Sequence, residues 1–150
     1  MNNFKVPYRF EGIHTAEAAV LCCIDFRFWK ETMQFVEEGL GIKSYDFPKL
    51  PGSTKAIIEA KDNDITMACI GVPCDLHHIK KIVVVDHEDC GAYGGSVKFD
   101  GDVAAEQAFH TEQLHLAKEI LAAKYSGKEI ILAYARLADE NTNVEFVLVD

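Results

Sequence analysis

The stretch Lys81–Gly95, KIVVVDHEDCGAYGG, decides the fold, because an apolar run there turns abruptly into a polar, glycine-rich loop. Residues 82–85 form an unalternated β-branched run, which is typical of a strand buried on both faces of a parallel sheet. His87 and Cys90 follow that run closely. In an open α/β sheet, ligands bind in the crevice outside the carboxyl ends of the strands. We therefore expect both side chains to lie at a functional edge of a central strand.

A second apolar run, AAVLCC at residues 18–23, also ends in a polar turn. If the two strands are parallel neighbours, their carboxyl ends bring Cys23, His87 and Cys90 to one place. Two thiolates and one imidazole leave a fourth tetrahedral position open, which is typical of a catalytic rather than a structural zinc site. The sequence therefore predicts a Zn²⁺ cofactor held by these three side chains.

The composition is typical of a globular protein of 150 residues, with 49% hydrophobic and 26% charged residues. A chain of this length predicts one domain, residues 1–150, with a core of its own. The net charge of −9 and the lack of a basic cluster argue against a nucleic-acid partner. No apolar run approaches the roughly 20 residues that span a bilayer, and the N-terminus lacks a signal-peptide core. We therefore expect a cytoplasmic protein with no membrane partner.

Helical and extended patterns alternate along the rest of the chain, which predicts an α/β domain. Residues 1–14 are expected to form an irregular or helical arm. Helices are predicted over residues 29–40, 53–61, 65–78 and 103–125, further strands over residues 44–47, 130–135 and 144–149, and a loop over residues 48–52. Pro73 would end or kink the third helix. The fold class that follows is a three-layer, mostly parallel sheet flanked by helices, and the hairpin between the last two strands admits an antiparallel C-terminal edge.

At the two polar turns the sequence resembles the β-class carbonic anhydrases. That family carries a Cys-x-Asp-Ser-Arg turn and a later His-x-x-Cys-Gly, which appear here as CIDFR at residues 23–27 and HEDCG at residues 87–91. The order of the motifs and the apolar strand before each of them agree, and the resemblance covers about residues 16–149. Phe26 stands where the family has a small hydroxylated residue. Pro51-Gly52-Ser53 stands where the family usually has Ala-Gly-Asn.

The resemblance implies reversible hydration of carbon dioxide to bicarbonate by a zinc-bound hydroxide, that is, a zinc lyase of the carbonate dehydratase type. Zinc would lower the pKa of its bound water toward roughly 7. Asp25 and Arg27 would be catalytic, Asp25 accepting a hydrogen bond from the hydroxide and Arg27 holding Asp25 ionised. Gly52 and Gly91 are the candidate substrate-binding residues. The resemblance also implies a homodimer or higher homo-oligomer, because the family's site lies at a dimer interface.

Three alternatives stay open on the sequence alone. Phe26 could narrow or dry the site, which would suit hydrolysis of carbonyl sulfide or carbon disulfide at the same metal. Asp25 occupies the fourth zinc position in some family members, and as a permanent ligand it would leave a non-catalytic, regulatory zinc-binding domain. Thiol chemistry ranks low, because Arg27 is too close to Cys23 for a phosphatase loop. The helical histidines His110 and His115 are expected to be solvated or to cap.

Overall fold

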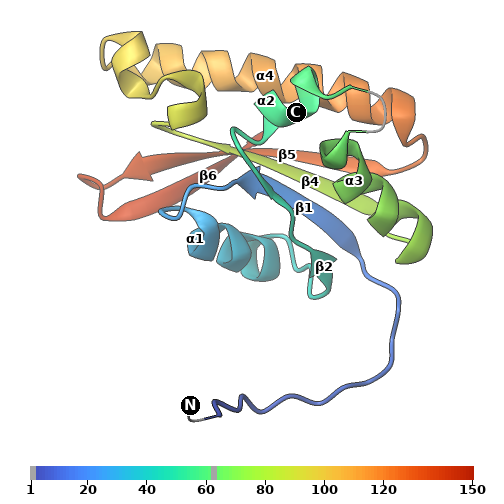
Figure 1. Ribbon diagram of the computed structural model, residues 1–150. Coiled ribbons are helices and arrows are strands. Elements are labelled where there is room, and N and C mark those ends of the chain that lie inside the picture. Colours follow the sequence, from blue (N-terminus) through green and yellow to red (C-terminus); the bar gives the residue numbers. More distant parts are fainter. Residues whose placement is uncertain (1–2, 62–63) are drawn as a thin grey trace.

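The computed structural model describes residues 3–61 and 64–150 and contains one mixed sheet with helices on both faces (Figure 1). The strands are β1 (Ala18–Cys23), β2 (Tyr45–Asp46), β3 (Lys49–Leu50), β4 (Lys81–His87), β5 (Glu129–Ala138) and β6 (Asn143–Val149). The helices are α1 (Trp29–Gln34), a π-helical turn η1 (Phe35–Gly39), α2 (Thr54–Glu59), α3 (Ile65–Leu76), the 3-10 turns η2 (Gly91–Tyr93) and η3 (Ser96–Phe99), and α4 (Val103–Lys124).

The strand order is β2-β1-β4-β5-β6, with β3 also paired to β1. All pairs are parallel except β5 with β6. The register places Cys22 opposite Val85, so β1 and β4 end at the same edge of the sheet. The predicted fold class, a mostly parallel sheet with an antiparallel C-terminal edge, is confirmed.

Two hydrophobic clusters cover the two faces of the sheet, and β4 contributes side chains to both of them. Ile82 and Val84 pack in the cluster that faces α2, α3 and α4, whereas Val83 and Val85 pack in the cluster that faces α1. Side chains of a strand alternate between its faces. The alternation continues past the apolar run. Asp86 therefore lies behind the predicted site, and His87 lies within it on the opposite face of the sheet.

Three local predictions differ from the structure. The helix predicted over residues 29–40 begins at Trp29 but becomes π-helical from Phe35, and the loop predicted over residues 48–52 contains the short strand β3. Pro73 lies inside α3 without dividing it, because it falls in the last turn and removes only one hydrogen bond near the helix end.

Residues 3–13 of the N-terminal arm are neither helical nor packed on the body of their own chain, and His14 contacts His77 where the arm joins the body. Residues 3–15 have no regular secondary structure and extend away from the sheet (Figure 1). The helical alternative for the arm is therefore wrong over residues 3–14, and residues 1–2 lie outside the described part.

None of the helices in residues 3–61 and 64–150 is long and apolar enough to cross a membrane.

Candidate metal centre

Three buried donor groups converge where β1 and β4 end. Cys23 is the last residue of β1, His87 is the last residue of β4, and Cys90 lies three residues further on, directly before η2. Their ligand atoms all lie within 4.8 Å of one another. Parallel neighbouring strands thus bring together two motifs that are more than 60 positions apart in the sequence, with the two sulfur atoms separated by 67 positions.

The geometry of these donors fits a zinc ion. Two sulfurs bound at about 2.3 Å to a tetrahedral zinc lie roughly 3.8 Å apart, and the Sγ atoms of Cys23 and Cys90 are separated by 3.9 Å. The Nδ1 of His87 donates to the carbonyl oxygen of Glu88 at 2.7 Å, an arrangement usual for a metal-binding histidine. The other ring nitrogen, Nε2, is buried and has no hydrogen-bond partner among the described residues. This nitrogen is the one left available to a metal.

The hydrogen bond between the Cys23 and Cys90 sulfurs moves their two pKa values apart. The pKa of Cys23 is lowered, above all because the Cys90 thiol donates a hydrogen bond to its sulfur. The same bond to Cys23, together with burial, raises the pKa of Cys90. The backbone N–H of Gly52 also donates to the Cys23 sulfur, at 3.4 Å. One thiolate is therefore stabilised already, and a metal ion would displace the proton of the second.

Asp25 is held beside the three donors by Arg27 and is not one of the converging groups. Arg27 donates through Nε and Nη2 to the two carboxylate oxygens of Asp25, at 3.0 and 2.7 Å. These hydrogen bonds lower the pKa of Asp25 to about 2. The same guanidinium reaches the second motif, where Nη1 donates to Asp89 Oδ2 at 2.8 Å and Nη2 donates to the Asp89 carbonyl at 3.0 Å. Arg27 thus ties the two motifs together and keeps Asp25 ionised.

The two glycines expected to bind substrate lie in different surroundings. Gly52 adopts φ +71°, and a Cβ there would lie 2.8 Å from the Cβ of Ala92, so only glycine brings this N–H to the Cys23 sulfur. Gly91 is exposed, and a Cβ there would meet open space. Phe26 is 81% exposed and therefore buries little surface against its own chain.

The buried carboxylates that support the site were not predicted from the sequence. Glu106 is 1% exposed and accepts hydrogen bonds from the backbone N–H of Asp89 at 2.7 Å and from the Ser96 hydroxyl at 2.6 Å. Asp86 accepts a bond from His110, so the expectation that His110 is solvated or caps is wrong. The signal was present, because positions 106 and 110 continue the buried row 114, 117 and 121 of α4 toward its N-terminus.

Fold and donor set together define a mostly parallel α/β protein with a buried thiolate–imidazole centre of three donors. Within this class, residues 13–148 match the sequence family described as "Putative carbonic anhydrase", and the chain belongs to that family. The predicted resemblance to carbonic anhydrases is thereby confirmed.

Relatives of the chain extend the comparison. Uncharacterized proteins of Rickettsia bellii (strain RML369-C) and Rickettsia conorii (strain ATCC VR-613 / Malish 7) are each 30% identical over 119 residues. The match spans 75% of this chain in both cases, and 72% and 63% of the two relatives. The solved carbonic anhydrase from Glaciozyma antarctica has a TM-score of 0.54 and 15% identity, over 93% of this chain and 87% of that one. That structure is similar to this chain in fold.

Proposed function

We propose that the protein is a zinc-dependent carbonate dehydratase, which interconverts carbon dioxide and bicarbonate. The observation that carries this proposal is the buried set of Cys23, His87 and Cys90, in which His87 Nε2 lacks a partner and the neighbouring carboxylate is tied up elsewhere. Membership of the carbonic anhydrase family supports the same activity. Three protein ligands would leave the fourth position of a zinc ion for the reaction.

The chain's own residues have separable roles in this proposal. The two thiolates and His87 Nε2 would hold zinc, which supplies the Lewis acidity that makes water nucleophilic near neutral pH. Asp25 stays ionised and accepts a hydrogen bond from the attacking water, which orients the water oxygen toward the carbon. Arg27 positions that carboxylate by donating to both of its oxygens, and this ion pair competes with direct ligation of Asp25 to the metal. This pairing speaks against the regulatory alternative, in which Asp25 would be a permanent ligand.

The test joins metal content with kinetics. We expect about one zinc per wild-type chain, loss of zinc in Cys90→Ser, and hydration of carbon dioxide in stopped-flow assays that rises from pH 7 to about 9. Cys69→Ser is the matched control, because Cys69 lies in α3, partly exposed and away from the site, and should keep its zinc. A folded, zinc-loaded protein without hydration activity at any of these pH values would overturn the proposal. Sulfide release from carbonyl sulfide or carbon disulfide would then identify the alternative substrates.

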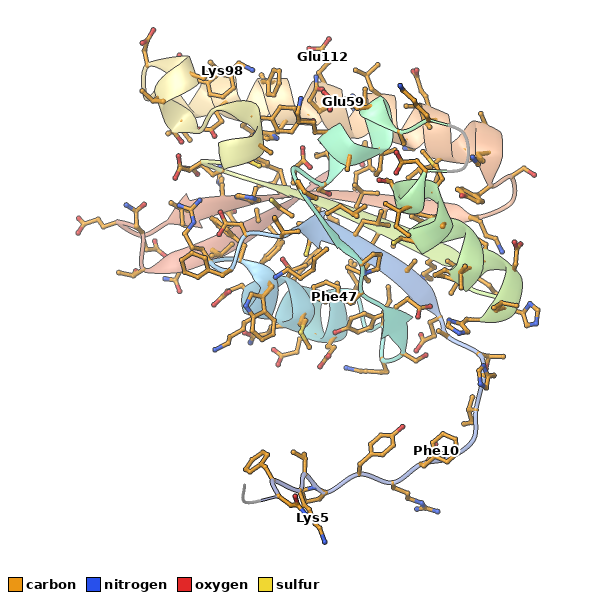
Figure 2. All side chains as sticks on the ribbon, viewed as in Figure 1. Lys5, Phe10, Phe47, Glu59, Lys98 and Glu112 are labelled. Atoms are coloured by element: carbon orange, nitrogen blue, oxygen red, sulfur yellow. The ribbon has the colours of Figure 1, made fainter. Side chains whose placement is uncertain are left out.

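We also propose that the protein works as a homodimer in which the arm of one copy covers the other. Every second residue of the arm from position 4 to position 10 carries a large apolar side chain. These side chains, 69–92% exposed, are Phe4, Val6, Tyr8 and Phe10. Figure 2 shows Lys5 and Phe10 far from the body of their own chain. Apolar surface of this kind usually marks an interaction site.

A groove beside the metal centre is the surface that suits this arm. It has a volume of about 850 Å³, and Arg27 and Phe28 form its border with the site. Its acidic lining residues are Glu31, Glu38 and Glu145. Their charge is opposite to that of Lys5 and Arg9 on the arm, which favours a second copy as the occupant.

Deletion of residues 3–14 tests the arrangement. We expect analytical ultracentrifugation to find a dimer for the full chain and a monomer for the truncated one. A truncated chain that stays dimeric would overturn the role of the arm, and a full-length monomer would overturn the dimer. Replacing the three glutamates of the groove with glutamine should weaken the dimer without unfolding either copy.

A further inference from the structure

The buried carboxylate of Asp86 lies behind the metal centre, on the opposite face of the sheet. Asp86 precedes His87 in β4, so the alternation of the strand directs it toward α2 and α4. Its side chain is 1% exposed. It accepts bonds from the Thr54 backbone N–H at 3.2 Å, the Thr54 hydroxyl at 2.6 Å and His110 Nδ1 at 2.8 Å. Both carboxylate oxygens are therefore occupied by groups from two other elements.

The bonds to Thr54 fix the loop that contacts Cys23. Helix α2 begins at Thr54, and the preceding Ser53 provides no side-chain cap, so the Asp86 carboxylate caps the first turn instead. Directly before it, Ser53 and Gly52 have φ values of +46° and +71°. A backbone in this unusual conformation persists only where its surroundings hold it. In this backbone conformation, the Gly52 N–H donates a hydrogen bond to the Cys23 sulfur.

The same hydroxyl connects to the segment that follows Cys90. Tyr93, in η2, has its hydroxyl 2.9 Å from Thr54 Oγ1. Because a carboxylate only accepts, the Thr54 hydroxyl donates to Asp86, and the Tyr93 hydroxyl donates to Thr54. His110 closes the cluster, with its ring edge-on to that of Tyr93 at 5.1 Å between centroids. The strand that carries His87, the turn after Cys90 and the loop that contacts Cys23 thus meet at Asp86.

We propose that Thr54, Asp86 and His110 are positioning residues for the metal centre. They hold the Gly52 N–H against the Cys23 sulfur and hold the turn after Cys90 against the same loop. A carboxylate and an imidazole are costly to bury, and well-packed apolar residues of the same volume often stabilise a fold as well or better. Outer hydrogen-bond partners, in contrast, orient ligands and tune their affinity for a metal. This inference rests on the proposed ligation by Cys23, His87 and Cys90.

The experiment compares two substitutions at one position. Thr54→Val keeps the shape and the backbone N–H but removes the hydroxyl, whereas Thr54→Ser keeps the hydroxyl. In competition with a chromophoric chelator, we expect Thr54→Val and Asp86→Asn to bind zinc about 10- to 100-fold more weakly. We expect Thr54→Ser to bind zinc like the wild type. In the cobalt(II)-loaded protein, the sulfur-to-cobalt absorption should move to lower energy in Thr54→Val, because a thiolate with a weaker N–H contact is more electron-rich.

A core variant separates positioning from general stability. Leu121→Ala opens a cavity in the hydrophobic cluster that faces α2, α3 and α4. Leu121 makes none of the hydrogen bonds around Asp86, so this variant should lose stability without a change in zinc affinity. The inference is overturned if Thr54→Val and Asp86→Asn bind zinc and absorb like the wild type, or if Leu121→Ala weakens zinc binding equally. In either case the proposed function stands. A wild type that binds no zinc overturns the proposed function and this inference together.

Discussion

Two polar clusters lie back to back at the end of β4, one on each face of the sheet, and they differ in how their atoms are satisfied. Behind the sheet, both oxygens of Asp86 are bonded, while His110 Nε2 and the neighbouring Ser53 and Tyr134 hydroxyls have no partner among the described residues. In front, His87 Nε2 also lacks a partner, but two thiols converge on it. Among the described residues no other group of donors converges in this way. An unpartnered buried atom therefore indicates a ligand site only where further donors surround it.

The largest effects on zinc affinity and on stability are expected when the histidine of each cluster is replaced in turn. His87→Ala deletes the nitrogen aimed at the metal, so zinc affinity should fall by more than the ~100-fold that loss of an outer partner costs. His110→Ala leaves the buried Asp86 carboxylate without its partner and opens a cavity. We expect it to lower the free energy of unfolding of the metal-free protein by about 3 kcal/mol. Urea unfolding with a chelator present, together with zinc titration, measures both effects.

The two variants should differ in which property, zinc affinity or stability of the fold, each of them lowers more. His87→Ala should be the more damaging variant for zinc, and His110→Ala the more damaging for the metal-free fold. If both variants lost zinc and stability in the same proportion, the two clusters would form one structural unit and the distinction drawn from the unpartnered nitrogens would be wrong.

Glu106→Gln sharpens the comparison at the second satisfied carboxylate. An amide keeps one acceptor oxygen for the Asp89 N–H but replaces the other with a donor, so the Ser96 hydroxyl must accept instead of donate, and both bonds lose the charge of the carboxylate. Because hydrogen bonds to a charged group contribute about 1.5–3 kcal/mol and neutral ones about 1 kcal/mol, we expect the free energy of unfolding to fall by about 1 kcal/mol. Because the hydrogen bond between the Asp89 N–H and Glu106 holds the turn that carries Cys90, we expect zinc affinity to fall about tenfold as well. Unfolding and chelator competition measure these changes, and an unchanged zinc affinity would show that the turn keeps its shape without Glu106.

The sequence predicted the front cluster better than the back one, for a physical reason. Cys23, His87 and Cys90 follow the ends of apolar strands, and parallel strands place their ends together by topology alone. Thr54 meets Asp86 from a short helix, and no local pattern sets which residue of that helix faces the sheet. Asp86 itself stands out in the sequence, because it is the charged residue that directly follows the apolar run 82–85. The fold was predictable because hydrophobic periodicity is local, whereas hydrogen bonds between distant segments depend on the packing of the whole molecule.

Asp102→Ala provides a smaller effect on the helix that carries Glu106 and His110. Asp102 caps α4, its carboxylate accepting the backbone N–H of Ala105 at 3.0 Å, and it lies at the surface. Loss of such a cap costs about 1 kcal/mol. We expect this loss in thermal or urea unfolding, with zinc affinity unchanged, because the buried part of α4 stays in place. A decrease in zinc affinity would mean that the first turn of α4, and not only its buried carboxylate, sets the metal centre.

The smallest effect belongs to a carboxylate that is satisfied but exposed. Glu17 accepts the backbone N–H groups of Lys43 and Ser44, and the bond from Lys43 does most to lower its pKa below the ordinary value of 4.5. A lowered pKa in the folded state means that Glu17 stabilises the fold above pH 4.5 and that this contribution disappears as the pH falls through the lowered value. Glu17→Gln should therefore be less stable than the wild type near neutral pH and equal to it in acid. A stability difference that is the same at every pH would assign the effect to the shape of the amide rather than to the charge, and salt should reduce the difference because the group is exposed.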